Sequence, residues 1–175
     1  MHYKDTIEHA MAFSKAAHMA VGQVRKYTGE PYHTHPFIVA NIVKDVGGST
    51  AMICAALLHD VVEDTHITLE QLDAEFGMEI SNLVFWVTDT QTHADGNRAT
   101  RKARECRKLS EAPPEAQTIK LADLIHNSQS IFQCDPKFAL VYLKEKRAIL
   151  EVMTLGHPEL YRQAWEIVNQ QECLC

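Results

Sequence analysis

The chain has 175 residues, of which 46% are hydrophobic and 23% charged, and its formal net charge is −6 at pH 7. This composition is ordinary for a globular protein, the length suits one hydrophobic core, and the acidic surplus argues against a general nucleic-acid binder. No segment approaches the roughly 18 apolar residues that span a bilayer. We therefore expect a single cytoplasmic domain over residues 1–175 that does not enter a membrane.

Cysteine usage indicates the same compartment. The five thiols lie at scattered positions: Cys54, Cys106, Cys134, Cys173 and Cys175. An odd number of cysteines with no signal peptide ahead of them is typical of reduced thiols in the cytoplasm. The Cys173-x-Cys175 pair could bind a metal or oxidise, although a frayed chain end is the simpler interpretation.

The first predicted helix carries an apolar stripe of helical period. It begins at an Asp5-x-x-Glu8 capping box. It ends at Arg25-Lys26, because cations interact favourably with a helix C-terminus. Residues 27–31 then form a loop.

The second predicted helix has Pro36 in its first turn, and the glycines at 47–48 end it. Ser49 or Thr50 can cap a third helix. That third helix contains residues 55–65, where an apolar run leads into a histidine and three acids.

A capping box at Thr68-x-x-Gln71 predicts the next helix, and Gly77 is a plausible stop. Residues 80–87 could pass for a buried strand. A lone strand would have no partner in this chain, so we expect a helix there.

The second half of the chain continues the helical pattern. Residues 98–108 form a basic helix, Pro113-Pro114 opens a helix that holds Asp123, and Asp135-Pro136 caps another. Residues 156–158 separate the last two helices. The chain is therefore predicted to be an all-α helical bundle of about eight to nine helices.

The stretch around residue 59 is the first candidate for chemistry. In a helix, His59 and Glu63 lie on one face, as do Asp60 and Asp64, because each pair is four residues apart. Burying such charges is costly unless they are paired or bound to a metal. A His-Asp dipeptide alone is weak evidence, because a histidine on an apolar helix is more often a hydrogen-bonded core residue.

Two residues far from this stretch favour a metal site. His35 precedes a helix at a proline that fixes the backbone, and Asp123 is an acid within an apolar helix. Together with His59 and Asp60 they form a set of two imidazoles and two carboxylates. Such a set suits borderline and harder divalent ions such as Mn²⁺, Zn²⁺ or Fe²⁺.

A divalent cation with two nearby acids can hydrolyse a phosphate ester. The cation polarises a phosphoryl oxygen. Glu63 is the candidate that takes the proton of the attacking water, and Asp64 assists it or supports the ligands.

Cations are needed to neutralise the phosphates of such a substrate. Arg25 and Lys26 are the first candidates because they lie close in sequence to His35. Arg101 and Arg104 share a face of the basic helix and are further candidates, although a solvated helix face is the more common meaning of a charge run.

These residues resemble a known family. His35, His59-Asp60 and Asp123 match the H…HD…D motif of the HD metal-dependent phosphohydrolases. A wider match, over residues 5–130, is similar to the hydrolase domain of bacterial stringent-response proteins and to the stand-alone small alarmone hydrolases. The matching segments are 25–26, 29–32, 35–36, 55–65, 76–77, 87–88, 120–123 and 126–127.

The resemblance implies an HD-type helical fold that binds Mn²⁺. It implies hydrolysis of the 3′-pyrophosphate of guanosine tetra- or pentaphosphate, which gives GDP or GTP and pyrophosphate. The implied metal ligands are His35, His59, Asp60 and Asp123. The implied water-handling pair is Glu63 and Asp64, and the implied nucleotide contacts are Arg25, Lys26 and Asn127.

The sequence departs from this family in two places. Tyr27 and Thr28 separate the basic pair from Gly29, where the relatives usually have one residue, and Ser128-Gln129 stands where stringent-response proteins tend to have Met-Arg. Both departures concern nucleotide contacts rather than the metal.

Two alternative functions stay open. The chain could be an HD phosphatase of another nucleotide, a nucleoside monophosphate or NADPH, or an inactive nucleotide-sensing module. In every case the expected partner is a small phosphorylated nucleotide, with no nucleic acid and no membrane, and a homodimer is left open.

Overall fold

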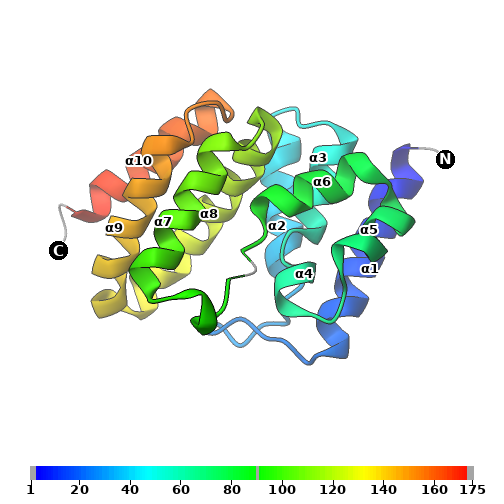
Figure 1. Ribbon diagram of the computed structural model, residues 1–175, viewed down its shortest axis with the longest axis horizontal. Coiled ribbons are helices and arrows are strands. Elements are labelled where there is room, and N and C mark those ends of the chain that lie inside the picture. The colour runs from blue at the N-terminus through cyan, green and yellow to red at the C-terminus, as the bar shows by residue number, and fades with distance from the viewer. Residues whose placement is uncertain (1–2, 90, 173–175) are drawn as a thin grey trace. The chain divides into compact units, whose positions relative to one another are not determined.

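The computed structural model describes residues 3–89 and 91–172. In this part of the chain every regular element is helical, and an isolated bridge between Val24 and Pro31 is the single β-type pairing. The predicted all-α class is therefore confirmed. The helices form two compact units, residues 1–88 and 89–175, and the colour ramp of Figure 1 follows the chain through them.

The N-terminal unit is built around one helix. Its helices are α1 (Tyr3–Ala20), α2 (Thr34–Asp45), α3 (Thr50–Leu58), α4 (Val61–Asp64), α5 (Leu69–Phe76) and α6 (Met78–Val87). Helix α3 packs against α1, α2 and α6. Its residues from Ile53 to Leu58 are all buried, so α3 forms the centre of this core.

Several predicted helix ends are confirmed in this unit. The Ser49 hydroxyl accepts a hydrogen bond from the Met52 amide and caps α3. Thr68 and Gln71 form the reciprocal capping box of α5. Gly77 separates α5 from α6 at a φ of 83°. Residues with a side chain rarely adopt that backbone conformation, so glycine is the favoured residue at this helix end. The ambiguous segment 80–87 is helical, as expected.

The predicted bounds of the first helix were wrong at both ends. Helix α1 already includes Tyr3, so Asp5 lies inside it and does not cap it. It ends at Ala20, well before Arg25-Lys26. A turn that includes Gly22, at φ 65°, follows the helix there, and Val24 is 56% exposed although its position continues the apolar stripe.

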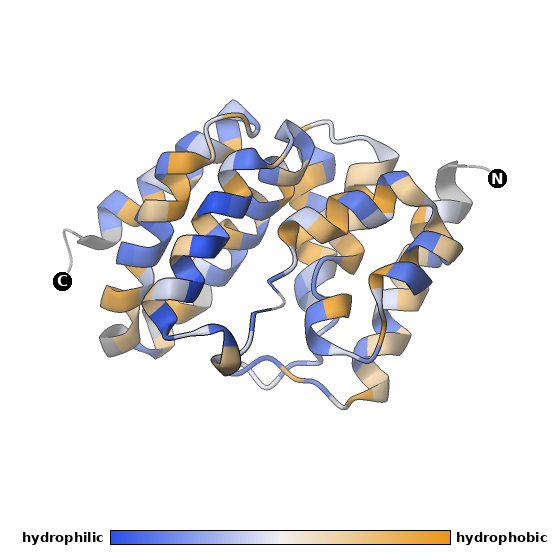
Figure 2. Cartoon of the chain, viewed as in Figure 1, coloured by the Kyte–Doolittle hydropathy of each residue, from blue (hydrophilic) through white to orange (hydrophobic). Residues whose placement is uncertain are grey.

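The C-terminal unit is a set of longer helices. It contains the 3₁₀ turn η1 (His93–Asp95), α7 (Arg98–Glu111), α8 (Pro114–Cys134), α9 (Pro136–Val152) and α10 (Pro158–Glu172). Helix α9 packs against α7, α8 and α10. Helix α7 is mostly hydrophilic, as the blue colouring of Figure 2 shows. Asp135 caps α9 through the Phe138 amide, as predicted.

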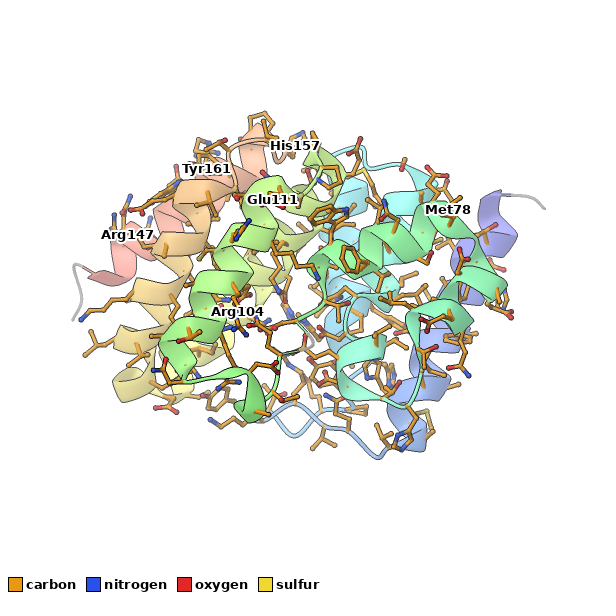
Figure 3. All side chains as sticks on the ribbon, viewed as in Figure 1. Met78, Arg104, Glu111, Arg147, His157 and Tyr161 are labelled. Atoms are coloured by element: carbon orange, nitrogen blue, oxygen red, sulfur yellow. The ribbon has the colours of Figure 1, made fainter. Side chains whose placement is uncertain are left out.

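The loop between α9 and α10 is held against α8. The Leu155 amide donates to Oε1 of the buried Gln117, and the His157 amide donates to Oγ1 of Thr118. The Gln117 side chain also donates to two backbone carbonyls at the end of α7. One buried amide therefore ties three segments of this unit together. His157 is labelled in Figure 3.

Gly156 lies where this loop meets α8 most closely. A Cβ added there would lie 2.6 Å from Cδ1 of Leu121 and 3.3 Å from backbone atoms of Gln117 and Thr118. We expect Gly156→Ala to lower the free energy of unfolding by about 1–3 kcal/mol, because overpacking forces neighbours to move. Urea unfolding measures the change. Thr154→Ala, an exposed change in the same loop, is the control and should stay within about 0.5 kcal/mol of the wild type.

Two cysteines fall outside the described residues. Cys173 and Cys175 lie beyond residue 172, so their interpretation stays a prediction. The three cysteines within the described part, Cys54, Cys106 and Cys134, are free thiols.

Candidate metal centre

One carboxylate oxygen in the N-terminal unit lies close to three other side chains. Oδ2 of Asp60 lies 3.1 Å from Nε2 of His59 and 3.5 Å from Nε2 of His35. The Tyr32 hydroxyl donates a hydrogen bond to the same oxygen over 2.7 Å. Two imidazole nitrogens and a carboxylate oxygen, predicted from the sequence as metal ligands, are therefore brought together.

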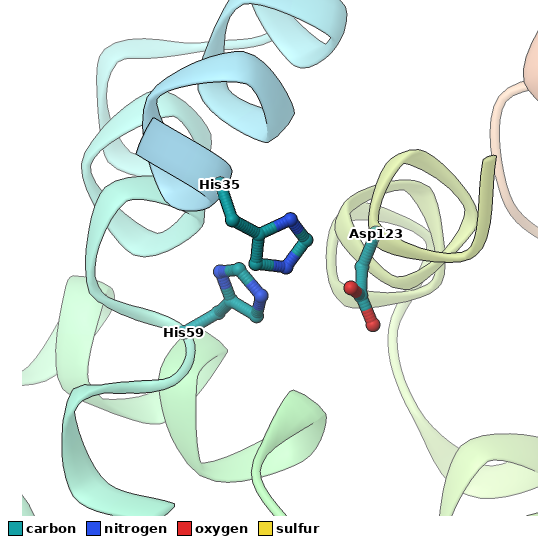
Figure 4. A group of neighbouring side chains, drawn as sticks. All are labelled: His35, His59 and Asp123. Atoms are coloured by element: carbon teal, nitrogen blue, oxygen red, sulfur yellow. The ribbon is translucent and has the colours of Figure 1, made fainter. Parts of the chain in front are cut away.

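The local fold explains how these side chains meet. His35 is the second residue of α2 and His59 follows the last residue of α3, and they are 0% and 1% exposed. Their ring centroids are 5.1 Å apart, and Figure 4 shows the two rings side by side. Helices α2 and α3 pack against each other, which places the two rings in one core.

The helix expected through residues 55–65 is interrupted. Helix α3 ends at Leu58, residues His59 and Asp60 form a turn, and α4 begins at Val61. The Asp64 amide still donates to the Asp60 carbonyl over 2.9 Å, so this pair keeps the expected spacing of one helical turn. The break lets Asp60 turn back toward the two histidines.

Hydrogen bonding sets the tautomer of His59. Its Nδ1 lies 2.8 Å from the Ala56 carbonyl oxygen, which can only accept, so Nδ1 carries the proton. In a neutral ring Nε2 then carries a lone pair, and that lone pair faces Oδ2 of Asp60. Two lone pairs at 3.1 Å repel each other unless a cation or a proton lies between them.

The distances in this cluster fit a metal site. Nitrogen and oxygen ligands lie about 2.0–2.2 Å from an ion, so two ligands at right angles are about 3.0 Å apart. The separations of 3.1 Å and 3.5 Å around Asp60 are of this size. A backbone carbonyl that holds the second nitrogen of a histidine is also the usual support for a metal-binding ring.

The predicted acidic pair lies on the single turn of α4. Glu63 is exposed to solvent, whereas Asp64 is half-buried and accepts a hydrogen bond from Nε2 of Gln23 over 2.9 Å. Burial raises the pKa of the Asp64 carboxyl, and the neighbouring Asp60 carboxylate raises it further. The two acids therefore differ in environment, which suits different roles.

The two residues of the basic pair, Arg25 and Lys26, contact different tyrosines. The Arg25 guanidinium lies 5.7 Å from the ring centroid of Tyr32, the residue that contacts Asp60. The Lys26 ammonium lies over the neighbouring Tyr27 ring at 4.7 Å and donates to its hydroxyl. Residues 25–29 form a tight loop, closed by the hydrogen bond that the Gly29 amide donates to the Arg25 carbonyl.

Asp123 lies in the middle of α8, in the C-terminal unit, and Figure 4 draws its carboxylate on that helix. It is 6% exposed. Its Oδ2 lies 3.0 Å from the Lys120 ammonium, and its Oδ1 accepts a hydrogen bond from Asn127 over 2.6 Å. Asp123, like His35 and His59, is thus a buried residue that offers a ligand atom.

The two arginines predicted on α7 have different surroundings. Arg104, labelled in Figure 3, is exposed. It donates to the Asp95 carbonyl over 2.9 Å, which ties η1 to α7. Arg101 is half-buried, and its backbone carbonyl accepts a hydrogen bond from the Gln91 side chain. The Arg104 side chain therefore helps to hold η1 against α7, whereas the hydrogen bond at Arg101 is made by its backbone.

Sequence reasoning missed a buried ion cluster on α7. Glu105 is buried and pairs with Lys102 over 2.5 Å. Burial raises the pKa of Glu105, but the charges of Lys120, Lys146 and Lys102 outweigh it and the net shift is downward. The signal in the sequence was a lone acid inside the basic run.

Within residues 3–89 and 91–172, no helix combines the length and the apolar character that crossing a bilayer requires.

Comparison with known proteins identifies the family. Residues 10–149 match the family model described as HD domain. The guanosine-3′,5′-bis(diphosphate) 3′-pyrophosphohydrolase MESH1 of Mus musculus is 38% identical over 124 residues, which is 69% of this chain and 68% of that relative. The chain therefore belongs to the HD domain family, as its H…HD…D motif predicted.

Other relatives carry related names. The probable guanosine-3′,5′-bis(diphosphate) 3′-pyrophosphohydrolase of Synechocystis sp. is 35% identical over 153 residues, which is 83% of this chain but 19% of the relative. The MESH1 protein of Xenopus tropicalis is 38% identical over 109 residues, which is 61% of this chain and 59% of the relative. The chain thus spans about a fifth of the Synechocystis protein and about three fifths of the Xenopus protein.

Solved structures agree in fold. A metazoan ortholog of SpoT, described as hydrolysing ppGpp, superposes on this chain with a TM-score of 0.84 at 25% identity, and the match covers 95% of each of the two chains. The structure of lmo0812 from Listeria monocytogenes superposes with a TM-score of 0.69 at 27% identity and covers 83% of this chain and 98% of that one.

Proposed function

We propose that this chain is a metal-dependent phosphohydrolase acting on guanosine tetra- or pentaphosphate. Water would attack the phosphorus of the 3′ ester, the bond between that phosphorus and the 3′ oxygen would break, and the 3′ oxygen would take a proton. Guanosine tetraphosphate and water would thereby give GDP and pyrophosphate. Membership of the HD domain family and the names of its relatives support the substrate. The observation that carries the proposal is the meeting of two histidine nitrogens at one oxygen of Asp60.

We propose His35, His59, Asp60 and Asp123 as the residues that hold a divalent cation. Two imidazoles and two carboxylates suit a borderline ion, and Mn²⁺ is our candidate. Such a cation supplies Lewis acidity toward a phosphoryl oxygen. Asp123 is supported by its burial and by the family motif, in which an aspartate of this kind completes the ligand set.

The remaining roles concern the water and the nucleotide. Glu63 takes the proton of the attacking water, because its carboxylate is exposed one turn after His59. Asp64 orients the water from its half-buried position, held by Gln23. The cations and amide proposed to bind the nucleotide are Arg25, Lys26, Asn127, Arg101 and Arg104. Among them Arg25 has the most direct support, because it lies over the tyrosine that contacts Asp60.

We also propose that the chain acts as one HD hydrolase domain over residues 1–175 in the cytoplasm. The family match over residues 10–149 extends across both compact units, which supports one functional domain. A small phosphorylated nucleotide is the proposed partner, and a homodimer stays a prediction.

A substrate panel tests this function. The purified chain with Mn²⁺ is incubated with guanosine tetraphosphate and, in parallel, with NADPH and nucleoside monophosphates. We expect GDP and pyrophosphate from the first and no product from the others. Release of single phosphate from NADPH or a monophosphate would overturn the proposed substrate. Binding without turnover of any nucleotide would instead indicate a sensing module.

A further inference from the structure

A buried histidine that none of these roles uses lies behind the acidic pair. His18 is in the last turn of α1 and is 0% exposed. It shares a buried face of that helix with Ala10 and Ser14, at intervals of four residues. We propose that His18 is a positioning residue that, through Gln23, fixes the orientation of the Asp64 carboxylate.

Each hydrogen bond in the series from His18 through Gln23 to Asp64 has a defined donor and acceptor. A carboxylate can only accept, so the amide nitrogen of Gln23 must donate to Oδ2 of Asp64, over 2.9 Å. The amide oxygen of Gln23 then faces Nδ1 of His18 at 2.7 Å. An amide oxygen can only accept, so Nδ1 of His18 carries the proton. The imidazole therefore determines which way the Gln23 amide points.

The protonation state of His18 is consistent with this arrangement. Burial lowers the pKa of His18 and outweighs the hydrogen bond to Gln23 and the charges of Asp60 and Asp64, which raise it. A neutral imidazole has one N–H group, and the hydrogen bond to Gln23 requires that group at Nδ1. The ring then adds no charge beside the acids and acts as an oriented donor.

His18 also supports the tyrosine that contacts Asp60. The ring centroids of His18 and Tyr32 are 5.0 Å apart. The backbone of Gln23 is held between the same two residues, because its amide donates to the His18 carbonyl and its carbonyl accepts from the Tyr32 amide. The end of α1 and the loop after it therefore form one support for Asp60 and Asp64.

The short helix α4 explains why Asp64 needs such a support. This helix has four residues and no side-chain hydrogen bond at its N-cap. A carboxylate at the end of a single turn has little intrinsic restraint, because helices of this length are not stable alone. The hydrogen bond from Gln23 supplies the restraint from outside the helix.

This proposal rests on the proposed function, because the orientation of Asp64 matters to hydrolysis only if Asp64 handles the water. The test therefore has a readout that is independent of turnover. In metal-free protein, the side-chain amide protons of Gln23 are followed by NMR in His18→Leu and His18→Asn. Asparagine places an N–H group near the position of Nδ1, whereas leucine does not.

We expect the Gln23 amide signals to move toward solvent-exposed values in His18→Leu and to stay near the wild-type values in His18→Asn. Unchanged signals in His18→Leu would overturn the hydrogen-bond chain, whatever the activity of the protein. Ser14→Ala, on the same buried face of α1, is the control and should leave these signals in place.

Kinetics then test the link to hydrolysis. We expect kcat for guanosine tetraphosphate to fall about 10- to 100-fold in His18→Leu, the size typical of a lost supporting hydrogen bond, with KM nearly unchanged and recovery in His18→Asn. Because His18 acts through Gln23, the double variant with Gln23→Leu should lose no more than Gln23→Leu alone. If the kcat losses of the two single variants multiply in the double variant, the proposed coupling is overturned. If NMR supports the hydrogen bonds from His18 through Gln23 to Asp64 while the wild type hydrolyses nothing, the proposed function fails and the positioning contact stands.

Discussion

Replacing Asp123 with alanine is expected to remove metal binding and hydrolysis together. The change deletes a buried carboxylate that we propose as a direct ligand. Loss of a group that only supports a ligand already costs about 10- to 100-fold in metal affinity, so we expect the affinity for Mn²⁺ to fall by more than about 100-fold. Elemental analysis of protein purified without chelator, followed by titration with Mn²⁺, measures this loss.

The neighbours of Asp123 make controls necessary. Alanine also removes the ion-pair partner of Lys120 and the acceptor of Asn127. Asp123→Asn keeps the size and an acceptor oxygen, so it should fold while still losing the charge that binds the ion. Glu115→Ala, an exposed change on the same helix, should bind metal normally. Normal metal stoichiometry in a folded Asp123→Ala protein would refute the proposed role of this residue.

Replacing Glu63 with glutamine is expected to abolish most turnover while the metal stays bound. Glutamine cannot accept the proton of the attacking water, and general base catalysis contributes about 10²- to 10⁴-fold. We therefore expect kcat to fall by about that factor, with Mn²⁺ stoichiometry equal to the wild type. Single-turnover assays of pyrophosphate release, with elemental analysis of the same sample, measure both quantities.

The position of Glu63 makes this variant easy to interpret. Its side chain is exposed on α4, so the substitution should change the free energy of unfolding by less than about 0.5 kcal/mol. Glu79→Gln, an exposed change in the first turn of α6, is the matched control and should keep full activity. Wild-type turnover in Glu63→Gln would show that another group takes the proton.

Local sequence signals predicted the helices and many of their ends. The caps at Ser49, Thr68 and Asp135 were correct because a side chain that bonds an amide three residues later needs no information from elsewhere in the chain. The predictions failed where the chain turns for a tertiary reason. The helical pattern of the sequence extended the first predicted helix past Val24 and the third through His59-Asp60. In the structure α1 ends at Ala20 and α3 at Leu58.

The sequence by itself determined the all-α class and the HD family, because helix caps are local signals and the motif residues are distinctive in kind and spacing. Only the tertiary structure decided that His35 and His59 meet at Asp60, because the packing of α2 against α3 brings together residues that are far apart in the chain. It also decided that His18 and Gln23 lie behind Asp64. An imidazole on an apolar helix face acquires a role only from the partner that packing places beside it.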